Sequence, residues 1–261
     1  MRYLFFILFL SLSSSSSYAQ PTKTITLAYS DVESFPFQMG NGESVSTPPG
    51  LSIDVIKQVA EQLNINVEYV RLPGKRVLSQ IRANQVDGGF IFSYSTERAQ
   101  YANYPMDSQH ADSTMRIATL DYFFYKLKDQ TLAWDGVALQ SIGDVPIGAH
   151  GGFSIAKKLK ENQVNTIEIE STGKLFEMLS KKRLAAIAIQ SNIANSYIDE
   201  NNLTNIERVT PPISTKDYYL IFGHKFTDEN PELVRRVWQV TSEVRDEVMA
   251  HSMKKYLTPE R

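Results

Sequence analysis

The feature that most limits the fold of this chain is an alternation of strand-like and helical segments that occurs twice. In the first half, strands are predicted at 24–29, 65–72 and 86–92, with helical patterns at 51–63 and from Pro73 onward. In the second half, strands at 145–149, 165–170 and 184–189 alternate with helices at 153–160, 173–182 and 191–200. Each half has the βαβ order of a parallel sheet covered by helices. We predict two small α/β lobes in place of one large sheet.

Two aromatic strands are expected to connect the lobes. Asp121–Lys126 (DYFFYK) ends the first alternation, and Asp217–His224 (DYYLIFGH) ends the second. If the second strand runs back beside the first, the helix that follows, from Glu232 to near Leu257, completes the first lobe. The predicted division is residues 20–119 and 224–261 for lobe 1 and residues 120–223 for lobe 2. A central cleft is then expected at the carboxyl ends of the strands, where ligands bind in such sheets.

Composition excludes several classes of function. The 261 residues include 27 Lys and Arg against 29 Asp and Glu, and this net charge of −2 argues against a nucleic-acid partner. Cys is absent, which rules out disulfides, thiolate metal sites and a Cys nucleophile. The four His residues, at positions 110, 150, 224 and 251, show no metal-ligand spacing. We therefore expect neither a metal nor a cofactor.

Residues 1–19 have the pattern of a secretory signal peptide. Arg2 gives a positive start, Tyr3–Leu12 is apolar, and the small residues Ser17 and Ala19 precede a cleavage site at Gln20. An apolar helix of this length spans ~15 Å, half of a bilayer core, so an uncleaved anchor is the weaker alternative. We expect export to a bacterial periplasm without a lipid anchor, because no Cys follows the cut.

Three segments together resemble one family. Gly50–Val55 (GLSIDV) opens the first helix, Val86–Phe90 (VDGGF) leads to Ser93–Ala99 (SYSTERA), and Ile147–Ser154 (IGAHGGFS) opens the second lobe. Their order and spacing resemble the family 3 solute-binding proteins that serve polar amino-acid uptake, which are type 2 periplasmic binding proteins. The resemblance covers about residues 24–257. It implies the two-lobed fold of that type, a small-molecule ligand and an inner-membrane ABC permease as partner.

Arg98 is the strongest candidate for binding a ligand. It is predicted to lie in the first turn of a helix that begins near Ser95, where a cation is unfavourable for the helix dipole. There the guanidinium and free backbone N–H groups form an anion site. The resemblance implies that Arg98 binds a ligand carboxylate and that Ser93 adds a hydrogen bond. The alternatives are a surface Arg paired with Glu97 and a Ser that only ends the strand.

The loop from Ser30 to Met39 holds two further candidates. The resemblance implies an aromatic residue here that covers the ligand, and we choose Phe35. The alternative for Phe35 is an apolar plug between the loop and the sheet. Glu33 is a candidate acceptor for a ligand ammonium, with a solvated carboxylate as the alternative.

Gly151–Ser154 (GGFS) resembles a glycine-rich anion loop at the start of a helix. It lacks the Lys-Ser/Thr pair of a nucleotide-binding loop. The resemblance implies that the backbone N–H groups of Gly152, Phe153 and Ser154 close over the ligand carboxylate from the second lobe. His150 would flank the cleft, or would be a strand-end His bonded to the backbone.

Gln190 departs from the family pattern, in which an Asp after this strand accepts the α-ammonium of the ligand. A neutral amide can accept a hydrogen bond but cannot neutralise a buried ammonium. Either Glu33 or another acid compensates, or the ligand is not an ordinary α-amino acid. Lys75 and Arg76 add positive charge near the second helix and would select an anionic ligand, unless they only form a solvated helix end.

The leading hypothesis is a monomeric periplasmic protein that binds a small polar carboxylate, an amino acid or a related compound. Its lobes would close by a hinge motion, and an ABC permease would recognise the closed form. The tyrosines at 122 and 218 are expected to pack at the hinge. One alternative is a dehydratase-like periplasmic enzyme, for which Glu33 and His150 are the only acid–base candidates and no motif pairs them. The other is a free sensory binding module.

Overall fold

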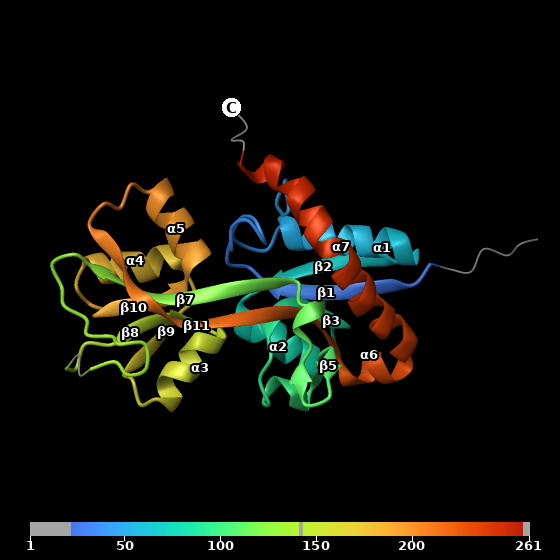
Figure 1. Ribbon diagram of the computed structural model, residues 1–261, viewed down its shortest axis with the longest axis horizontal. Helices are drawn as coiled ribbons and strands as arrows, with labels where there is room; N and C mark the ends of the chain where they lie inside the picture. Colours follow the sequence, from blue (N-terminus) through green and yellow to red (C-terminus); the bar gives the residue numbers. More distant parts are fainter. Residues whose placement is uncertain (1–21, 141–142, 258–261) are drawn as a thin grey trace, which may run out of the picture.

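The computed structural model describes residues 22–140 and 143–257, so the predicted signal peptide lies outside the described residues. Two α/β lobes lie at opposite ends of an elongated molecule, and two long strands run between them (Figure 1). None of the helices in the described part of the chain is both long and apolar enough to cross a membrane.

The first lobe is built on parallel strands covered by helices, as predicted. Its main elements are β1 (Thr24–Ser30), β2 (Asn66–Leu72), β3 (Gly88–Ser93), α1 (Leu51–Leu63), α2 (Gly74–Arg82), α6 (His224–Glu229) and α7 (Pro231–Leu257). β1 pairs in parallel with both β2 and β3. The predicted face of α1, with Ile53, Ile56 and Val59, is buried, and Asn64 ends the helix in a left-handed conformation. The short helix α6 was not predicted.

The second lobe repeats this arrangement. Its elements are β8 (Ile147–His150), β9 (Thr166–Ile169), β10 (Ala186–Gln190), α3 (Ser154–Glu161), α4 (Thr172–Ser180) and α5 (Ser191–Glu200). β8 lies between β10 and β9 and pairs with both in parallel. Every residue of β10 is buried, in keeping with its continuous apolar sequence.

Two crossing strands connect the lobes, but they pair differently from the prediction. They are β7 (Ala118–Leu127) and β11 (Ile206–Gly223), which lie antiparallel along most of their length. Residues 121–126 of β7 pair with residues 207–215 of β11, whereas residues 218–222 of β11 pair with β3. The segment 206–216 was not predicted as a strand because it is polar and contains Pro211 and Pro212. These prolines lie at a break in the ladder between Val209 and Ser214, a position that proline tolerates.

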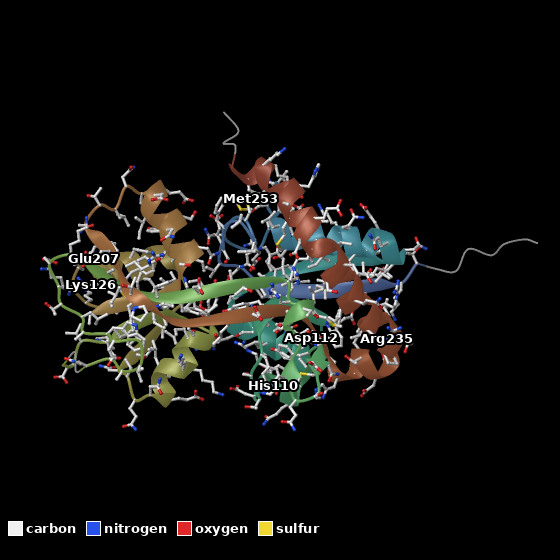
Figure 2. The ribbon with its side chains drawn as sticks, viewed as in Figure 1. His110, Asp112, Lys126, Glu207, Arg235 and Met253 are labelled. Atoms are coloured by element: carbon white, nitrogen blue, oxygen red, sulfur yellow. The ribbon has the colours of Figure 1, made fainter. Side chains whose placement is uncertain are left out.

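The crossing strands also join the two lobes into one hydrogen-bonded sheet. The strand order is β2-β1-β3-β11-β7-β10-β8-β9, so the expectation of two separate sheets is wrong. At the far end of the second lobe, the ammonium of Lys126 pairs with the carboxylate of Glu207 across the two strands (Figure 2). The lobes are therefore tied together by a continuous pair of strands, which positions the segments that face each other between them.

The C-terminal helix α7 packs on α1 of the first lobe (Figure 1). The Tyr256 hydroxyl donates to Asp54 Oδ2 at 2.6 Å and accepts from the backbone N–H of Gly50 at 3.0 Å. Lys255 also pairs with Asp54 at 2.6 Å. Short elements lie between β3 and β7: η1 (Arg98–Gln100), β4 (Ala102–Asn103), β5 (Met106–Asp107), β6 (His110–Ala111) and η2 (Ser113–Met115).

Candidate functional site

A small cavity lies between the lobes beside the crossing strands, and we call it the central cavity. Its volume is about 30 Å³, the space of one or two water molecules. The crossing strands contribute Tyr122 and Tyr218 to its lining. Five of the predicted site residues, three of them from one loop, meet here: Arg98, Gly152, Phe153, Ser154 and Gln190.

Arg98 lies at the contact between the lobes, with 7% of its surface exposed. Its Nη1 donates to the backbone carbonyl of Ser93 at 2.8 Å and to Ser93 Oγ at 3.2 Å. Its Nη2 donates across the cleft to the carbonyl of Gly152 at 3.2 Å. Ser93 itself is buried, and its carbonyl and hydroxyl oxygens orient the guanidinium. Every side-chain hydrogen bond that the structure shows for Arg98 thus ends on a neutral oxygen.

The helix predicted around Arg98 is only a single 3₁₀ turn, Arg98–Gln100. The chain turns at Tyr101 into the short strand β4, which leaves no room for an α-helix. The helix dipole therefore does not contribute to this site. The guanidinium is instead held by the end of β3 and by the second lobe.

Gln190 lies at the centre of a neutral hydrogen-bond network. Its Nε2 donates to the hydroxyls of Tyr218 at 3.1 Å and Tyr122 at 3.3 Å, and the Tyr218 hydroxyl donates to that of Tyr122 at 3.1 Å. Its Oε1 accepts from Ser34 Oγ of the first lobe at 3.3 Å. Burial raises the pKa of both tyrosines, so they stay protonated. No group in this network carries charge.

Ser34, rather than Phe35 or Glu33, lines the central cavity from the loop after β1. Ser34 and Gln38 exchange two backbone hydrogen bonds, at 2.9 and 3.1 Å, which fold the loop back and direct both side chains inward. Asn192 of α5 fixes this loop by donating to Ser34 Oγ and to the carbonyl of Phe35, both at 2.8 Å. Glu33 and Phe35 consequently lie outside the lining of the central cavity.

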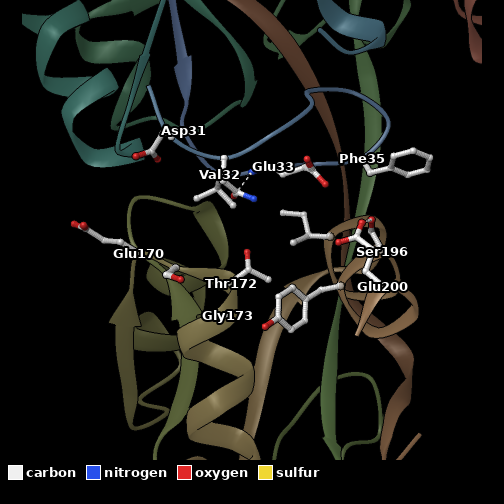
Figure 3. A pocket seen from close by; sticks show the side chains of 14 residues that line it. Asp31, Val32, Glu33, Phe35, Glu170, Thr172, Gly173, Ser196 and Glu200 are labelled. Atoms are coloured by element: carbon white, nitrogen blue, oxygen red, sulfur yellow. Dashed lines mark hydrogen bonds between the residues drawn. The ribbon is translucent and has the colours of Figure 1, made fainter. Parts of the chain in front are cut away.

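Glu33 and Phe35 line a neighbouring pocket of about 450 Å³ instead, which we call the acidic chamber. Here the loop with Asp31 and Glu33 faces Glu170 and Glu200 of the second lobe (Figure 3). The carboxylate of Glu33 accepts from the backbone N–H of Gly40. Burial raises the pKa of both Asp31 and Glu33, and the negative charges of Glu170 and Glu200, respectively, add to this effect.

The loop before α3 brings the backbone of the second lobe against the first. Gly152 has φ +79°, and a side chain at this position would come within 2.7 Å of the Lys75 backbone nitrogen, so only glycine fits. Phe153 and Ser154 follow it into the central cavity. The glycine-rich loop, which we predicted to bind an anion, thus forms a close contact between the lobes.

His150 lies behind this loop and does not line the central cavity. Its Nε2 is 3.2 Å from Thr172 Oγ1, and its ring packs 5.0 Å from that of Phe153. Burial lowers the pKa of His150 to about 4, so the ring is neutral at physiological pH. No contact that the structure shows within the described residues joins it to Glu33, the other acid–base candidate of the enzyme alternative.

A third pocket, of about 770 Å³, adjoins the central cavity and shares Arg98, Gly152, Phe153 and Ser154 with it. We call it the basic chamber, because its charged lining residues are mostly cationic. Lys75 of the first lobe pairs with Glu168 of the second at 2.9 Å, and Lys157 of the second lobe pairs with Glu97 of the first. Arg76 is exposed and lines none of these pockets.

Sequence reasoning missed several residues of this site. Ser34 and Asn192 gave no signal of their own, because their importance comes from contacts more than 150 positions away. Tyr122 and Tyr218 were expected only to pack, whereas their hydroxyls bind Gln190. Within the described ranges, 22–140 and 143–257, no group of His, Asp and Glu is arranged to hold a metal ion.

Comparison with known proteins agrees with this geometry. The model of the family described as bacterial extracellular solute-binding proteins, family 3, matches residues 27–259. A search of curated proteins gave no match. Solved structures with the same fold are numerous, although their sequences are distant.

Three of these structures illustrate the range. The GluR0 ligand-binding core from Nostoc punctiforme, in complex with L-glutamate, is 18% identical with a TM-score of 0.67, over 90% of this chain and all of that one. A histidine kinase sensor domain with similarity to periplasmic binding proteins is 16% identical with a TM-score of 0.72, over 90% and 96%. An ancestral arginine-binding protein bound to glutamine is 16% identical with a TM-score of 0.69, over 91% and 99%.

The family match spans nearly the whole described chain, and the fold matches proteins built as two lobes around a cleft. The predicted family and fold class are therefore confirmed. This chain belongs to the bacterial extracellular solute-binding proteins, family 3, and has the two-lobed type 2 periplasmic binding fold.

Proposed function

We propose that this protein captures a small carboxylate between its lobes and that Arg98 binds the carboxylate group. The observation that carries the proposal is the setting of Arg98. Its guanidinium is buried at the lobe contact, and its hydrogen bonds go to Ser93 and Gly152, which are neutral. A buried charge without a counter-ion is costly, and a carboxylate that replaces the Gly152 carbonyl would provide one.

Binding requires the lobes to separate first, because the central cavity holds only one or two water molecules. The direct contacts that hold the lobes together here include those from Arg98 to Gly152, from Ser34 to Gln190 and from Asn192 to the Ser34 loop. A ligand would replace these contacts and then hold the lobes together. The crossing strands β7 and β11 would bend in this motion. We place the lobe boundaries at residues 119/120 and 223/224.

The neutral network around Gln190 supports a ligand without an α-ammonium. Gln190 already uses both Nε2 hydrogens on tyrosine hydroxyls, and its oxygen accepts from Ser34. The nearest carboxylates of the loop line the acidic chamber rather than the central cavity. An α-ammonium in the central cavity would therefore lack a counter-ion. Carboxylates that lack this group are expected to bind better than their amino-acid counterparts.

The wider role that we propose is delivery to an ABC permease by an exported, monomeric protein whose residues 1–19 have been removed. A sensory role is the second candidate, because similar structures include a histidine kinase sensor domain. Deletion of the permease would abolish ligand uptake in the first case. In the second case, uptake would persist and a ligand-dependent response would be lost.

The experiment that tests the proposal is a thermal-shift screen of the mature protein, followed by calorimetry. The panel contains amino acids, their deaminated analogues, dicarboxylates and small amines. A ligand at 100 times its dissociation constant should stabilise the fold by ~2.7 kcal/mol. Carboxylates should raise the melting temperature, and the Arg98→Ala variant should not respond. Stabilisation by amines alone would contradict the proposal.

A further inference from the structure

The basic chamber carries more positive charge than its own carboxylates can balance. Seven cationic residues line it, against the three carboxylates of Glu97, Glu161 and Glu168. Glu168 accepts from Lys75 and Lys160, and Glu97 and Glu161 both pair with Lys157. All three carboxylates are thus engaged by three lysines. The four remaining cations are Arg82, Arg98, Lys158 and Lys216, for which the described part of the chain shows no salt bridge.

Lys216 and Lys158 line the basic chamber together with Arg98, which also lines the central cavity. Lys216 of β11 directs its ammonium to Ser154 Oγ at 3.3 Å, and Ser154 lines both spaces. Lys158 of α3 donates to the carbonyl of Ile213 at 2.8 Å. The hydrogen-bond partners of these three cations are therefore neutral oxygens. The three side chains come from both lobes and from a crossing strand.

The mutual repulsion of these cations affects the pKa of Lys216. Partial burial lowers the pKa of its ammonium, and the positive charges of Arg98 and Lys158 lower it further. An anion placed among the three side chains would reverse this effect and provide hydrogen-bond acceptors for donors that now share neutral ones.

We propose that the basic chamber is a second anion subsite, in which Lys216 and Lys158 bind a second anionic group of the ligand whose first carboxylate lies on Arg98. This inference rests on the proposed function, because it places the ligand through Arg98. The chemical class that it predicts is a small solute with two carboxylates joined by a short chain.

The size and position of the chamber favour such a solute. It lies between the lobes and shares Arg98 and Ser154 with the central cavity, so one molecule can reach both spaces. A volume of about 770 Å³ is in the range of small-molecule sites. A long polyanion is disfavoured, because the protein as a whole has a net charge of −2.

Calorimetry with matched ligands tests the inference. Glutarate and pentanoate have the same number of carbons but differ in the second carboxylate. Both are titrated into the mature wild-type protein and into the Lys216→Gln and Lys158→Gln variants. Lys225→Gln is the control, since it removes one exposed charge from α6, outside the chamber. Melting curves of each variant check that the fold is retained.

We expect wild-type protein to bind glutarate at least about tenfold more tightly than pentanoate, as a charged hydrogen bond allows. Lys216→Gln should remove most of this preference by weakening glutarate binding alone, Lys158→Gln should weaken it less, and Lys225→Gln should change neither ligand. Equal affinities of the two ligands, or loss of both ligands together in Lys216→Gln, would overturn the second subsite while leaving the role of Arg98 intact. If neither ligand binds wild-type protein, the proposed function fails as well.

Discussion

The acidic and basic chambers are formed by the same two lobes, yet their lining residues carry opposite charge. As a result, the pKa of a glutamate is raised in one chamber and lowered in the other. Four carboxylates line the acidic chamber without any Lys or Arg among its lining residues, whereas seven cations line the basic one. Burial raises the pKa of Glu33 and the charge of Glu200 raises it further, which outweighs the backbone N–H of Gly40 and the charge of Arg71. Burial would also raise the pKa of Glu168, but hydrogen bonds from Lys160 and Lys75 lower it to about 2.

This difference shows how a protein of nearly neutral overall charge can orient a ligand. Under the proposed function, a carboxylate in the cleft would be repelled at the acidic chamber and attracted toward Arg98 at the basic one. The neutral Gln190 network lines the central cavity beside Arg98 and adds polarity without charge. The expected result is an anionic ligand held with its charges on the Arg98 side.

The largest effect is expected on removing the cation at the lobe contact. Arg98→Ala should reduce carboxylate affinity by ~2–5 kcal/mol, because a buried ligand charge would lose its partner. This corresponds to roughly 30-fold to several thousandfold in the dissociation constant measured by calorimetry. Arg98→Lys should recover only part of the loss, because an ammonium lacks the two-pronged geometry. Unchanged carboxylate affinity in Arg98→Ala would show that the ligand carboxylate does not lie at Arg98.

The next effect concerns the neutral network around Gln190. Gln190→Asp should shift preference toward α-amino acids over their deaminated analogues, by ~1–3 kcal/mol, since it adds a charged acceptor for the ammonium. The hydroxyls of Tyr122, Tyr218 and Ser34 surround the amide that this carboxylate would replace. Calorimetry of one such ligand pair with both proteins measures the shift. Tight binding of the amino acid but not the analogue by wild-type protein would show that the ammonium has another partner.

A smaller effect is expected from the carboxylate that bridges the lobes in the basic chamber. The folded-state pKa of Glu168, about 2, lies below its unfolded value, so its charge stabilises the fold above about pH 4.5, and this contribution is lost as the pH falls toward 2. Glu168→Gln should lower the unfolding free energy at pH 7 by ~1–2 kcal/mol, allowing for solvent screening of its lysine partners. Urea titrations at several pH values measure this.

The matched control for Glu168 is Glu177→Gln. Glu177 pairs with Lys181 on the exposed surface of a single helix, so its loss should change the urea midpoint little. If Glu168→Gln and Glu177→Gln behave alike at pH 7, the lysines of the basic chamber give Glu168 no special stability.

The smallest effect is expected in the acidic chamber and has the opposite sign. The pKa of Glu33 is raised in the folded state, so protonation favours the fold, and this contribution is lost as the pH rises through the raised pKa. Glu33→Gln should therefore increase stability at pH 7 by less than about 1 kcal/mol. It should give no increase at low pH, where Glu33 is already protonated. A loss of stability at pH 7 would show that the charged hydrogen bond to Gly40 outweighs burial.

Much of the fold could be predicted because local patterns determine it. The predicted helices at 51–63 and 191–200 match α1 and α5, and α7 begins at Pro231, one residue before the predicted start at Glu232. The segment 206–216 could not be predicted, since its pairing with β7 compensates for a polar sequence with two prolines. Secondary structure near Arg98 was also misjudged, because the following chain must turn into β4.

The candidate site was predictable to the extent that it lies at the ends of strands. Arg98 comes shortly after β3, and Gln190 is the last residue of β10. Both residues line the central cavity. The choice of Phe35 over Ser34 could not be decided from sequence, because the Ser34–Gln38 backbone bonds determine which side chains face inward. The opposite charges of the two chambers could not be predicted from sequence either, because each chamber forms only where residues from both lobes meet.

The most direct test of the central claim is a crystal structure of the mature protein with a bound carboxylate, from which the distance between ligand oxygen and Arg98 guanidinium is measured. We expect a charge-assisted contact of about 2.7–2.9 Å. We also expect that the Arg98–Gly152 hydrogen bond is replaced by the ligand. A carboxylate bound in the acidic chamber, or anywhere without contact to Arg98, would show that Arg98 does not bind the ligand.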